Sequence, residues 1–202
     1  MIVINMIERL LKMKNVVLFD FFGVIGYELS PVWFRRYFED SIADATKHRL
    51  VDPGDLGAIS EDEMFENIGA EVGVDAKQVR KEWMELVTIN DEMVKFIKEV
   101  KKSYPVYLLS NALSGFLREI LEKNDLYELF DEVYISAEIH LAKPDPEFFR
   151  ECLKRIGVRA EETVMIDDNT KNLEAARSVG IDTIHFTDNE SFQAQFKNYY
   201  NV

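Results

Sequence analysis

The sequence is short of cysteine, of long apolar runs and of basic residues relative to acidic ones. Its single cysteine, Cys152, cannot form an internal disulfide, which favours a reducing, cytoplasmic location with this thiol buried and inert. No apolar run approaches the roughly 18 residues that a membrane-spanning helix needs. The formal net charge of −13 disfavours binding to nucleic acids or to an anionic membrane surface. We therefore expect neither kind of partner.

Two further signals are missing. The first 14 residues have neither a basic segment ahead of their apolar residues nor a small-residue cleavage site, so a signal peptide is not indicated. A short helix and a start-site extension ahead of Met13 both remain open for this segment, and we assign it no function. The first apolar run is not followed by G-x-G-x-x-G, so a dinucleotide-binding domain is not expected.

What is present is an alternation of short apolar runs with amphipathic segments. Runs of this length closed by Gly, Pro or Asp are typical of strands buried on both faces. The order predicts a doubly wound parallel α/β sheet. The expected strands are 16–20, 105–110, 133–136, 163–167 and 182–186. The expected helices are 30–49, 60–73, 75–87, 90–100, 113–123, 145–157 and 170–179, with a turn at 51–54 and one last helix after Asp188.

The stretch 27–90 contains helical patterns and no convincing strand. A chain of 202 residues fits one domain, or one core that carries an insert. We expect residues 1–26 and 91–202 to form the α/β core, and residues 27–90 to form an inserted helical unit.

Polar side chains follow the predicted strands where each strand ends. Asp20, Ser110 and the pair Asp167-Asp168 end three of them, and Lys143 follows a fourth. In a parallel sheet these ends meet at one edge. Such a set can handle phosphate: the acidic residues can hold Mg²⁺, Asp20 can attack phosphorus, and Ser110 and Lys143 can bind phosphoryl oxygens. Each residue alone could equally be a helix cap, a turn residue or solvated surface.

The same residues carry a resemblance. The segments Phe19-Asp20-Phe21-Phe22-Gly23-Val24-Ile25, Leu108-Leu109-Ser110-Asn111, Lys143-Pro144-Asp145-Pro146 and Met165-Ile166-Asp167-Asp168-Asn169, with Asn172, resemble in order the motifs of the haloacid dehalogenase (HAD) superfamily. The resemblance runs from about Val16 to Asp188 and is closest to the subfamily with a helical C1-type cap. It implies a HAD-like Rossmannoid core, with residues 27–90 as the cap that closes over the substrate.

The resemblance also implies roles for residues. Asp20 would be the nucleophile, and Ser110, Asn111 and Lys143 would bind the phosphate of a small phosphorylated metabolite. The cofactor would be Mg²⁺, held by Asp20, Asp168 with Asp167 beside it, and the backbone carbonyl of Phe22. In the cap, the side chains to inspect are Trp33, Arg35, Arg36, His48 and Arg49. The aromatic side chains are better explained as the core of the cap, and Arg35 and Arg36 can equally be solvated helix surface.

The chain departs from the family at Phe22, where phosphatases usually carry a second aspartate that transfers a proton. Three interpretations follow. The chain could be a phosphatase for leaving groups that need little protonation, such as acyl or anomeric sugar phosphates. It could be a metal-independent 2-haloacid dehalogenase, which Asp167 and Asp168 argue against. It could be a non-catalytic module that binds a phosphorylated ligand. Glu28, His48 and His140 are the candidates for a substitute proton donor. A receiver domain is excluded, because its acidic pair precedes its acceptor aspartate and it has no room for the insert.

Overall fold

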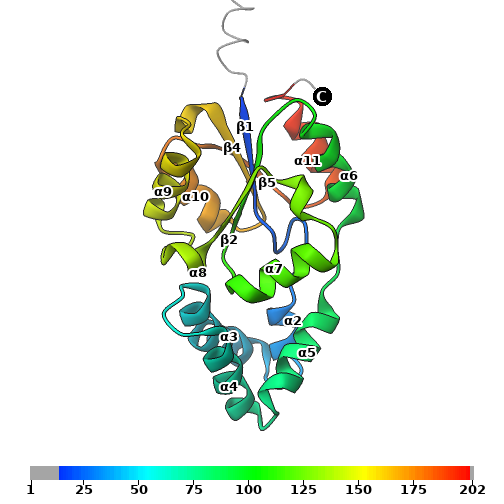
Figure 1. The fold of residues 1–202 in the computed structure, drawn as a ribbon, viewed down its shortest axis with the longest axis vertical. Coiled ribbons are helices and arrows are strands. Elements are labelled where there is room, and N and C mark those ends of the chain that lie inside the picture. The colour runs from blue at the N-terminus through cyan, green and yellow to red at the C-terminus, as the bar shows by residue number, and fades with distance from the viewer. Residues whose placement is uncertain (1–13, 201–202) are drawn as a thin grey trace, which may run out of the picture.

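The computed structural model describes residues 14–200, which form a five-stranded parallel sheet with helices on both faces (Figure 1). The interpretations of the segment before Lys14 concern residues outside this range. The strands lie in the order β3-β2-β1-β4-β5, and each pairs in parallel with its neighbour. Their bounds are β1 Val16–Phe19, β2 Val106–Ser110, β3 Glu132–Ile135, β4 Thr163–Asp167 and β5 Asp182–His185. The predicted fold class is confirmed.

The two faces of the sheet are covered by different helices because successive strand residues point to opposite sides. In β1, Val17 and Phe19 pack with α6 (Asp91–Val100), α7 (Ser114–Lys123) and α11 (Asn189–Phe196). On the other face, Val16 and Leu18 pack with α9 (Pro146–Ile156) and α10 (Thr170–Ser178). All four β1 residues are buried, which accounts for the continuous apolar run in the sequence.

Most predicted helix ends are confirmed by their caps. The side chains of Ser60, Asp75, Asn90 and Asp145 accept hydrogen bonds from backbone N–H groups at the first turns of α4 (Glu61–Val72), α5 (Ala76–Leu86), α6 and α9. Helix α4 ends at Gly73, whose φ of 72° is accessible to glycine at little cost. The helix expected after Asp188 is α11, and Asp188 caps it.

The predicted helix over 30–49 is wrong. Helix α2 (Ser30–Phe34) stops after five residues, and α3 (Asp40–Asp55) begins after a turn. In that turn the N–H groups of Arg36 and Tyr37 donate to carbonyls three residues back, at 3.0 Å each. The turn brings the ring centroids of Tyr37 and Trp33 to 4.7 Å from each other. Aromatic packing therefore accompanies the break in the helix.

The predicted turn at 51–54 is also wrong, because α3 continues through Pro53 to Asp55. A proline inside a helix costs about 3 kcal/mol. Burying an aliphatic side chain gains about 1.5–3 kcal/mol, and both Leu50 and Val51 are buried here. The free energy gained by burying these two side chains therefore exceeds the cost of the proline in the helix. A smaller correction concerns Ser136, which begins the short helix α8 (Ser136–Ile139) rather than ending β3.

Helices α2 to α5 lie together at one end of the molecule, beyond the sheet (Figure 1). Glu61 connects them to α7, because its Oε2 accepts from the N–H of Phe116 at 2.9 Å. Its Oε1 accepts at 2.9 Å from Arg80 of α5, which also donates to Glu119 of α7 at 2.7 Å. On the other side, the Ser136 hydroxyl donates to the backbone carbonyl of Asp55. These contacts hold the helical unit against α7 and α8.

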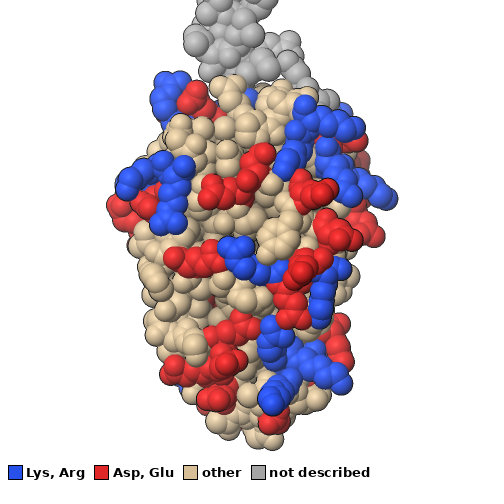
Figure 2. Space-filling model, in the orientation of Figure 1, with Lys and Arg blue, Asp and Glu red and all other residues tan. Residues whose placement is uncertain are grey.

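Acidic and basic side chains alternate over the visible face of the molecule, with uncharged surface between them (Figure 2). Among residues 14–200, no helix has the length and apolar character needed to cross a membrane.

Candidate active site

The carboxyl ends of β1, β2 and β4 bring together the polar residues that the sequence singled out. The Nζ of Lys143 lies 2.7 Å from Oδ2 of Asp20 and 2.8 Å from Oδ2 of Asp167. Asp20 is only 7% exposed, Lys143 4%, and Ser110 and Asp167 are fully buried. An ammonium group thus bridges two carboxylates at the edge of the sheet, out of contact with bulk water.

Burial dominates the electrostatics of this cluster. It raises the pKa of Asp20 well above its ordinary value, and the charge of Asp167 adds to this while Lys143 opposes it. For Lys143, burial lowers the pKa, but the charges of Asp167 and Asp20 outweigh it, so the net pKa is raised. Burial, and then Asp167, also raise the pKa of Asp168. Lys143 therefore stays charged, and the cluster favours a further cation.

The Ser110 hydroxyl is buried and has no hydrogen-bond partner among the described residues. Leaving a buried polar group unsatisfied costs about 1–3 kcal/mol. A ligand that accepts a hydrogen bond at this position would remove that cost. The predicted role of Ser110 as a phosphate donor fits this arrangement.

Asn111 and Asn172 hold the cluster in place. The Asn111 amide exchanges two hydrogen bonds with the backbone of Lys143, donating at 2.7 Å and accepting at 2.9 Å. Its side chain therefore positions the Lys143 loop, and direct binding of phosphate by Asn111 stays a prediction. The Nδ2 of Asn172 lies 3.1 Å from both carboxylate oxygens of Asp167. The N–H of Asn169 donates to Asp167 Oδ1 at 2.8 Å.

Asp20, Asp167 and Asp168 each offer a carboxylate oxygen, and these atoms lie within 4.8 Å of one another. Hard oxygen ligands in this number suit Mg²⁺. Gly23 makes room for the third ligand, because a Cβ there would lie 2.2 Å from Oδ2 of Asp168. The backbone at Gly23 also has a φ of 85°, which L side chains rarely adopt. The residues present fit a divalent cation.

The Phe22 ring lies edge-on to that of Phe21, with ring centroids 5.0 Å apart, and Phe22 borders the same cavity as Asp20. The Phe22 ring places an apolar surface at the position where phosphatases of the family that this chain resembles usually carry a proton-transferring carboxylate. The use of its backbone carbonyl as a metal ligand stays a prediction.

A cavity of about 560 Å³ opens above the cluster, between the sheet edge and the helical unit. Glu28 and His48 line it, while His140 bonds instead to the carbonyl of Leu56 at 3.3 Å. The other cap side chains that the sequence marked for inspection do not line the cavity. Trp33 donates to Glu82, Arg35 and Arg49 pair with Asp40 and Glu71, and Arg36 is exposed.

The cavity also contains residues that the sequence did not single out for function, among them Lys47, Val51, Asp52, Asp55, Trp83, Leu113 and Phe116. Burial, followed by the charge of Asp52, raises the pKa of Asp55 to about 7. His48 Nδ1 lies 3.1 Å from Oδ2 of Asp52, one helical turn away on α3. These side chains come together at the cavity only when α3 and α5 dock at the end of the sheet. No local sequence motif therefore predicted that they would line it.

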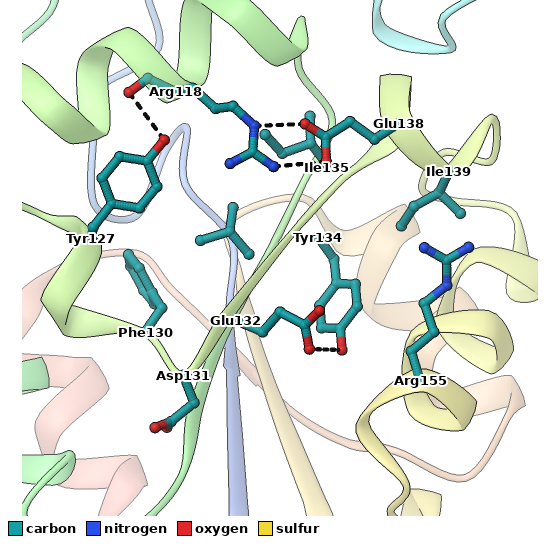
Figure 3. A pocket seen from close by; sticks show the side chains of 11 residues that line it. Arg118, Tyr127, Phe130, Asp131, Glu132, Tyr134, Ile135, Glu138, Ile139 and Arg155 are labelled. Atoms are coloured by element: carbon teal, nitrogen blue, oxygen red, sulfur yellow. Dashed lines mark hydrogen bonds and ion pairs between the residues drawn. The ribbon is translucent and has the colours of Figure 1, made fainter.

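A second hollow of about 370 Å³ lies at β3 (Figure 3). Most of the polar groups drawn there already bind one another, and Arg155 and Asp131 pair with Glu151 and Lys101, which are not drawn. Arg118 Nε donates to Glu138 at 2.7 Å, and the Tyr134 hydroxyl donates to Glu132 at 2.6 Å. The hollow is lined by none of the polar residues of the cluster, which are Asp20, Ser110, Lys143, Asp167 and Asp168. The chemistry therefore belongs to the larger cavity.

Comparisons with known proteins give the family of the chain and its relatives. Residues 35–186 match the family described as haloacid dehalogenase-like hydrolase. The sesquiterpene phosphatase astK of Aspergillus oryzae is 25% identical over 175 residues, which cover 85% of this chain and 89% of the relative. The D-ribitol-5-phosphate phosphatase of Bacteroides thetaiotaomicron is 27% identical over 186 residues, covering 84% and 90%. A HAD family enzyme of the same bacterium, solved as a magnesium complex, is 25% identical with a TM-score of 0.76, covering 92% and 99%.

Proposed function

Because the chain belongs to the haloacid dehalogenase-like hydrolases, we propose that it is a Mg²⁺-dependent phosphatase that acts on a small phosphorylated metabolite with Asp20 as the nucleophile. One observation carries the proposal: the cluster of buried Asp20, Lys143 and Asp167 with half-buried Asp168 borders a cavity large enough for an organic phosphate. The two relatives with phosphatase names support it.

The reaction proceeds in two steps. A carboxylate oxygen of Asp20 attacks phosphorus, and the bond between phosphorus and the leaving oxygen breaks, with its electron pair departing on that oxygen. Water then cleaves the aspartyl-phosphate, which releases inorganic phosphate and regenerates the Asp20 carboxylate. Ser110 donates a hydrogen bond to a phosphoryl oxygen, and Lys143 balances the charge of Asp20 and of the phosphoryl group.

Asp20, Asp167 and Asp168 would hold the Mg²⁺ together with the backbone carbonyl of Phe22. The bound cation would reduce the repulsion between the attacking carboxylate and the anionic phosphate. Asn172 and the N–H of Asn169 keep Asp167 in position for this task.

Phe22 decides which leaving groups are suitable, because its side chain cannot transfer a proton. Positioned proton transfer contributes about 10²–10⁴-fold to such reactions. The leaving group should therefore need little protonation, as in acyl phosphates or anomeric sugar phosphates. Glu28 and His48 line the cavity and stay predictions as substitute donors, whereas the place of His140 outside it removes the reason to consider that residue.

We also propose that residues 27–90 act as a cap over the active site, with residues 1–26 and 91–202 as the core. Glu28, Lys47, Val51 and Trp83 from this stretch share the cavity with Asp20 and Lys143. A cap placed there excludes water from the reacting groups.

Phe22 also favours a second candidate, a non-catalytic module that binds a phosphorylated ligand. A panel of acetyl phosphate, an aldose 1-phosphate and an alkyl phosphate, each with and without Mg²⁺, separates the two functions. Phosphate release that needs Mg²⁺ and is lost in Asp20→Asn supports the phosphatase. Equal release by the wild type and Asp20→Asn contradicts it, and binding without turnover indicates the second function. Halide release from 2-haloacids without metal would favour the dehalogenase alternative.

A further inference from the structure

The cavity above Asp20 has an apolar wall that the chemistry at phosphorus does not use. Five side chains form this wall: Leu29, Val51, Trp83, Leu113 and Phe116. They come from the residue before α2, from α3 and α5, and from the beginning of α7. Chain segments far apart in the sequence thus build one surface.

These five side chains face the cavity rather than bulk water. Leu29, Val51 and Leu113 are each 4% exposed, and Trp83 and Phe116 are each 3% exposed, yet all five line the cavity. Apolar surface that borders a cavity is favourable to cover with hydrocarbon. Among these five side chains only the indole N–H of Trp83, which has no partner among the described residues, could bond to a polar group. A polyol placed there would lose most of its hydrogen bonds to water.

The wall is held by close packing behind it. The Trp83 ring lies 6.1 Å from that of Phe116 at an angle of 77°, and 5.4 Å from that of Phe65 at 81°. Gly54 permits the close approach of α3, because a Cβ there would lie 2.8 Å from a methyl carbon of Leu113. The surface is therefore preformed, which lowers the entropy lost when a ligand binds.

The cavity has room for a leaving group as well as a phosphate. A water molecule occupies about 30 Å³ in the liquid, and the cavity has about 560 Å³. Asp20 and Lys143 border it together with the apolar wall. A phosphoryl group at Asp20 therefore leaves most of this volume for the rest of the substrate.

We infer that the substrate is a phosphate compound with an apolar organic group, an acyl phosphate with a hydrocarbon chain or its aryl counterpart, whose hydrocarbon part packs against this wall. The inference rests on the proposed phosphatase function and adds the class of leaving group. Two constraints lead to this class: Phe22 cannot supply a proton, so the leaving oxygen must be weakly basic, and the apolar wall favours hydrocarbon. A carboxylate leaves as an anion and needs no proton from the enzyme.

A homologous series tests the inference: acetyl, butanoyl and hexanoyl phosphate, compared by kcat/KM with Mg²⁺ present and after subtraction of spontaneous hydrolysis. The leaving carboxylates have similar basicity, so the series varies mainly in apolar surface. We expect kcat/KM to rise about fourfold for each added methylene until the chain fills the cavity. Acetyl phosphate turnover that depends on Asp20, with a flat series, overturns the inference and leaves the phosphatase function standing.

A matched pair of variants on α3 locates the effect. Val51→Thr replaces a methyl group of the wall by a hydroxyl, and should lower the ratio of hexanoyl to acetyl kcat/KM about fivefold or more. Ile42→Thr makes a comparable change at a side chain that is 53% exposed on the same helix, and should leave the ratio unchanged. An equal ratio in both variants and the wild type contradicts the inference.

A binding measurement keeps the inference testable if the chain proves inactive. Calorimetry with Mg²⁺ and ethyl, butyl or hexyl phosphonate should show affinity that rises with chain length in the wild type and less steeply in Val51→Thr. Phosphonates that bind equally well whatever their chain length contradict the apolar subsite.

Discussion

The Lys143 ammonium group lies 2.7 Å from Oδ2 of Asp20, and this contact balances a negative charge that the protein holds away from water. The same ammonium lies 2.8 Å from Asp167. Both carboxylates depend on one cation from the chain, so three buried charges act as a unit. Such a unit is costly to break, because removal of one partner leaves the others uncompensated.

We therefore expect Lys143→Met to lower the free energy of unfolding by about 3–5 kcal/mol near neutral pH in the absence of divalent cations. Urea unfolding measures this. The deficit should shrink at acidic pH, because the pKa of Asp20 is already raised, first by burial and then by Asp167, and protonation removes one uncompensated charge. Lys171→Met at the rim of the cavity is the control and should cost little. A deficit that is the same at acidic and neutral pH would contradict this account of the cluster.

The place of Gly23 beside Asp168 leads to a second prediction. Gly23→Ala should weaken Mg²⁺ binding about tenfold or more, because the new methyl group would displace the Asp168 carboxylate. Titration calorimetry with Mg²⁺ measures the affinity. Gly73→Ala is a matched control: its φ of 72° imposes a similar backbone strain, but a Cβ there meets no atom within 4 Å. Both variants should lose some stability, while only Gly23→Ala should lose metal affinity. Equal Mg²⁺ affinity in the two would show that Asp168 is no ligand.

A third prediction concerns the missing proton donor. Phe22→Asp should raise kcat/KM for an alkyl phosphate by about 10²–10⁴-fold, while kcat/KM for acetyl phosphate changes far less. The reason is that only the alkoxide leaving group needs a proton as it departs. Phe22→Asn is the matched control, since an amide of similar size cannot supply that proton. A similar gain in the asparagine variant would mean that removal of the phenyl ring, rather than proton transfer, caused the effect.

A fourth prediction follows from Asp55. Burial, followed by the charge of Asp52, raises its pKa to about 7. An acid whose pKa is higher in the folded protein stabilises the fold fully below its unfolded pKa of about 4, and this contribution is lost as the pH rises toward about 7. The shift of the Asp55 pKa to about 7 corresponds to about 4 kcal/mol, and solvent at this half-buried side chain screens part of it. Asp55→Asn removes the charge, so it should raise stability by about 2 kcal/mol at about pH 8 and have little effect at about pH 4.

Differential scanning calorimetry checks the Asp55 prediction at both pH values. For a chain of this size, about 2 kcal/mol corresponds to a Tm increase of about 4–8 °C. Asp44→Asn, an exposed position on the same helix, should not show this dependence on pH. A variant of Asp55 that is less stable at about pH 8 would contradict the assignment of a buried, destabilising charge there.

The sheet and the residues at its edge were predictable from the sequence because their signals are local. A four-residue apolar run such as 16–19 must be buried on both faces, and the carboxyl ends of parallel strands converge. Caps such as Ser60 and Asp75 likewise mark helix ends within a few residues. The juxtaposition of Asp20, Ser110, Lys143 and Asp167 therefore followed from short patterns and one topological rule.

The walls of the cavity were not predictable because they depend on packing between distant segments. Pro53 and Gly54 read as a turn, but burial of Leu50 and Val51 keeps α3 helical and turns Val51 toward the cavity. Trp83 and Phe116 meet only because α5 docks against α7. Asp55 is one acid among many in the sequence, and its raised pKa exists only in the folded protein.

The central claim is that Asp20 is the nucleophile. To test it, the wild type is mixed with acetyl phosphate and Mg²⁺ and quenched with acid, and the peptide that contains Asp20 is analysed by mass spectrometry. We expect one phosphoryl group on Asp20, which forms at least as fast as inorganic phosphate is released. We expect no phosphoryl group on Asp20 when Mg²⁺ is withheld. Mg²⁺-dependent release of phosphate with no phosphoryl group on Asp20, or with the group on another residue, would contradict the claim.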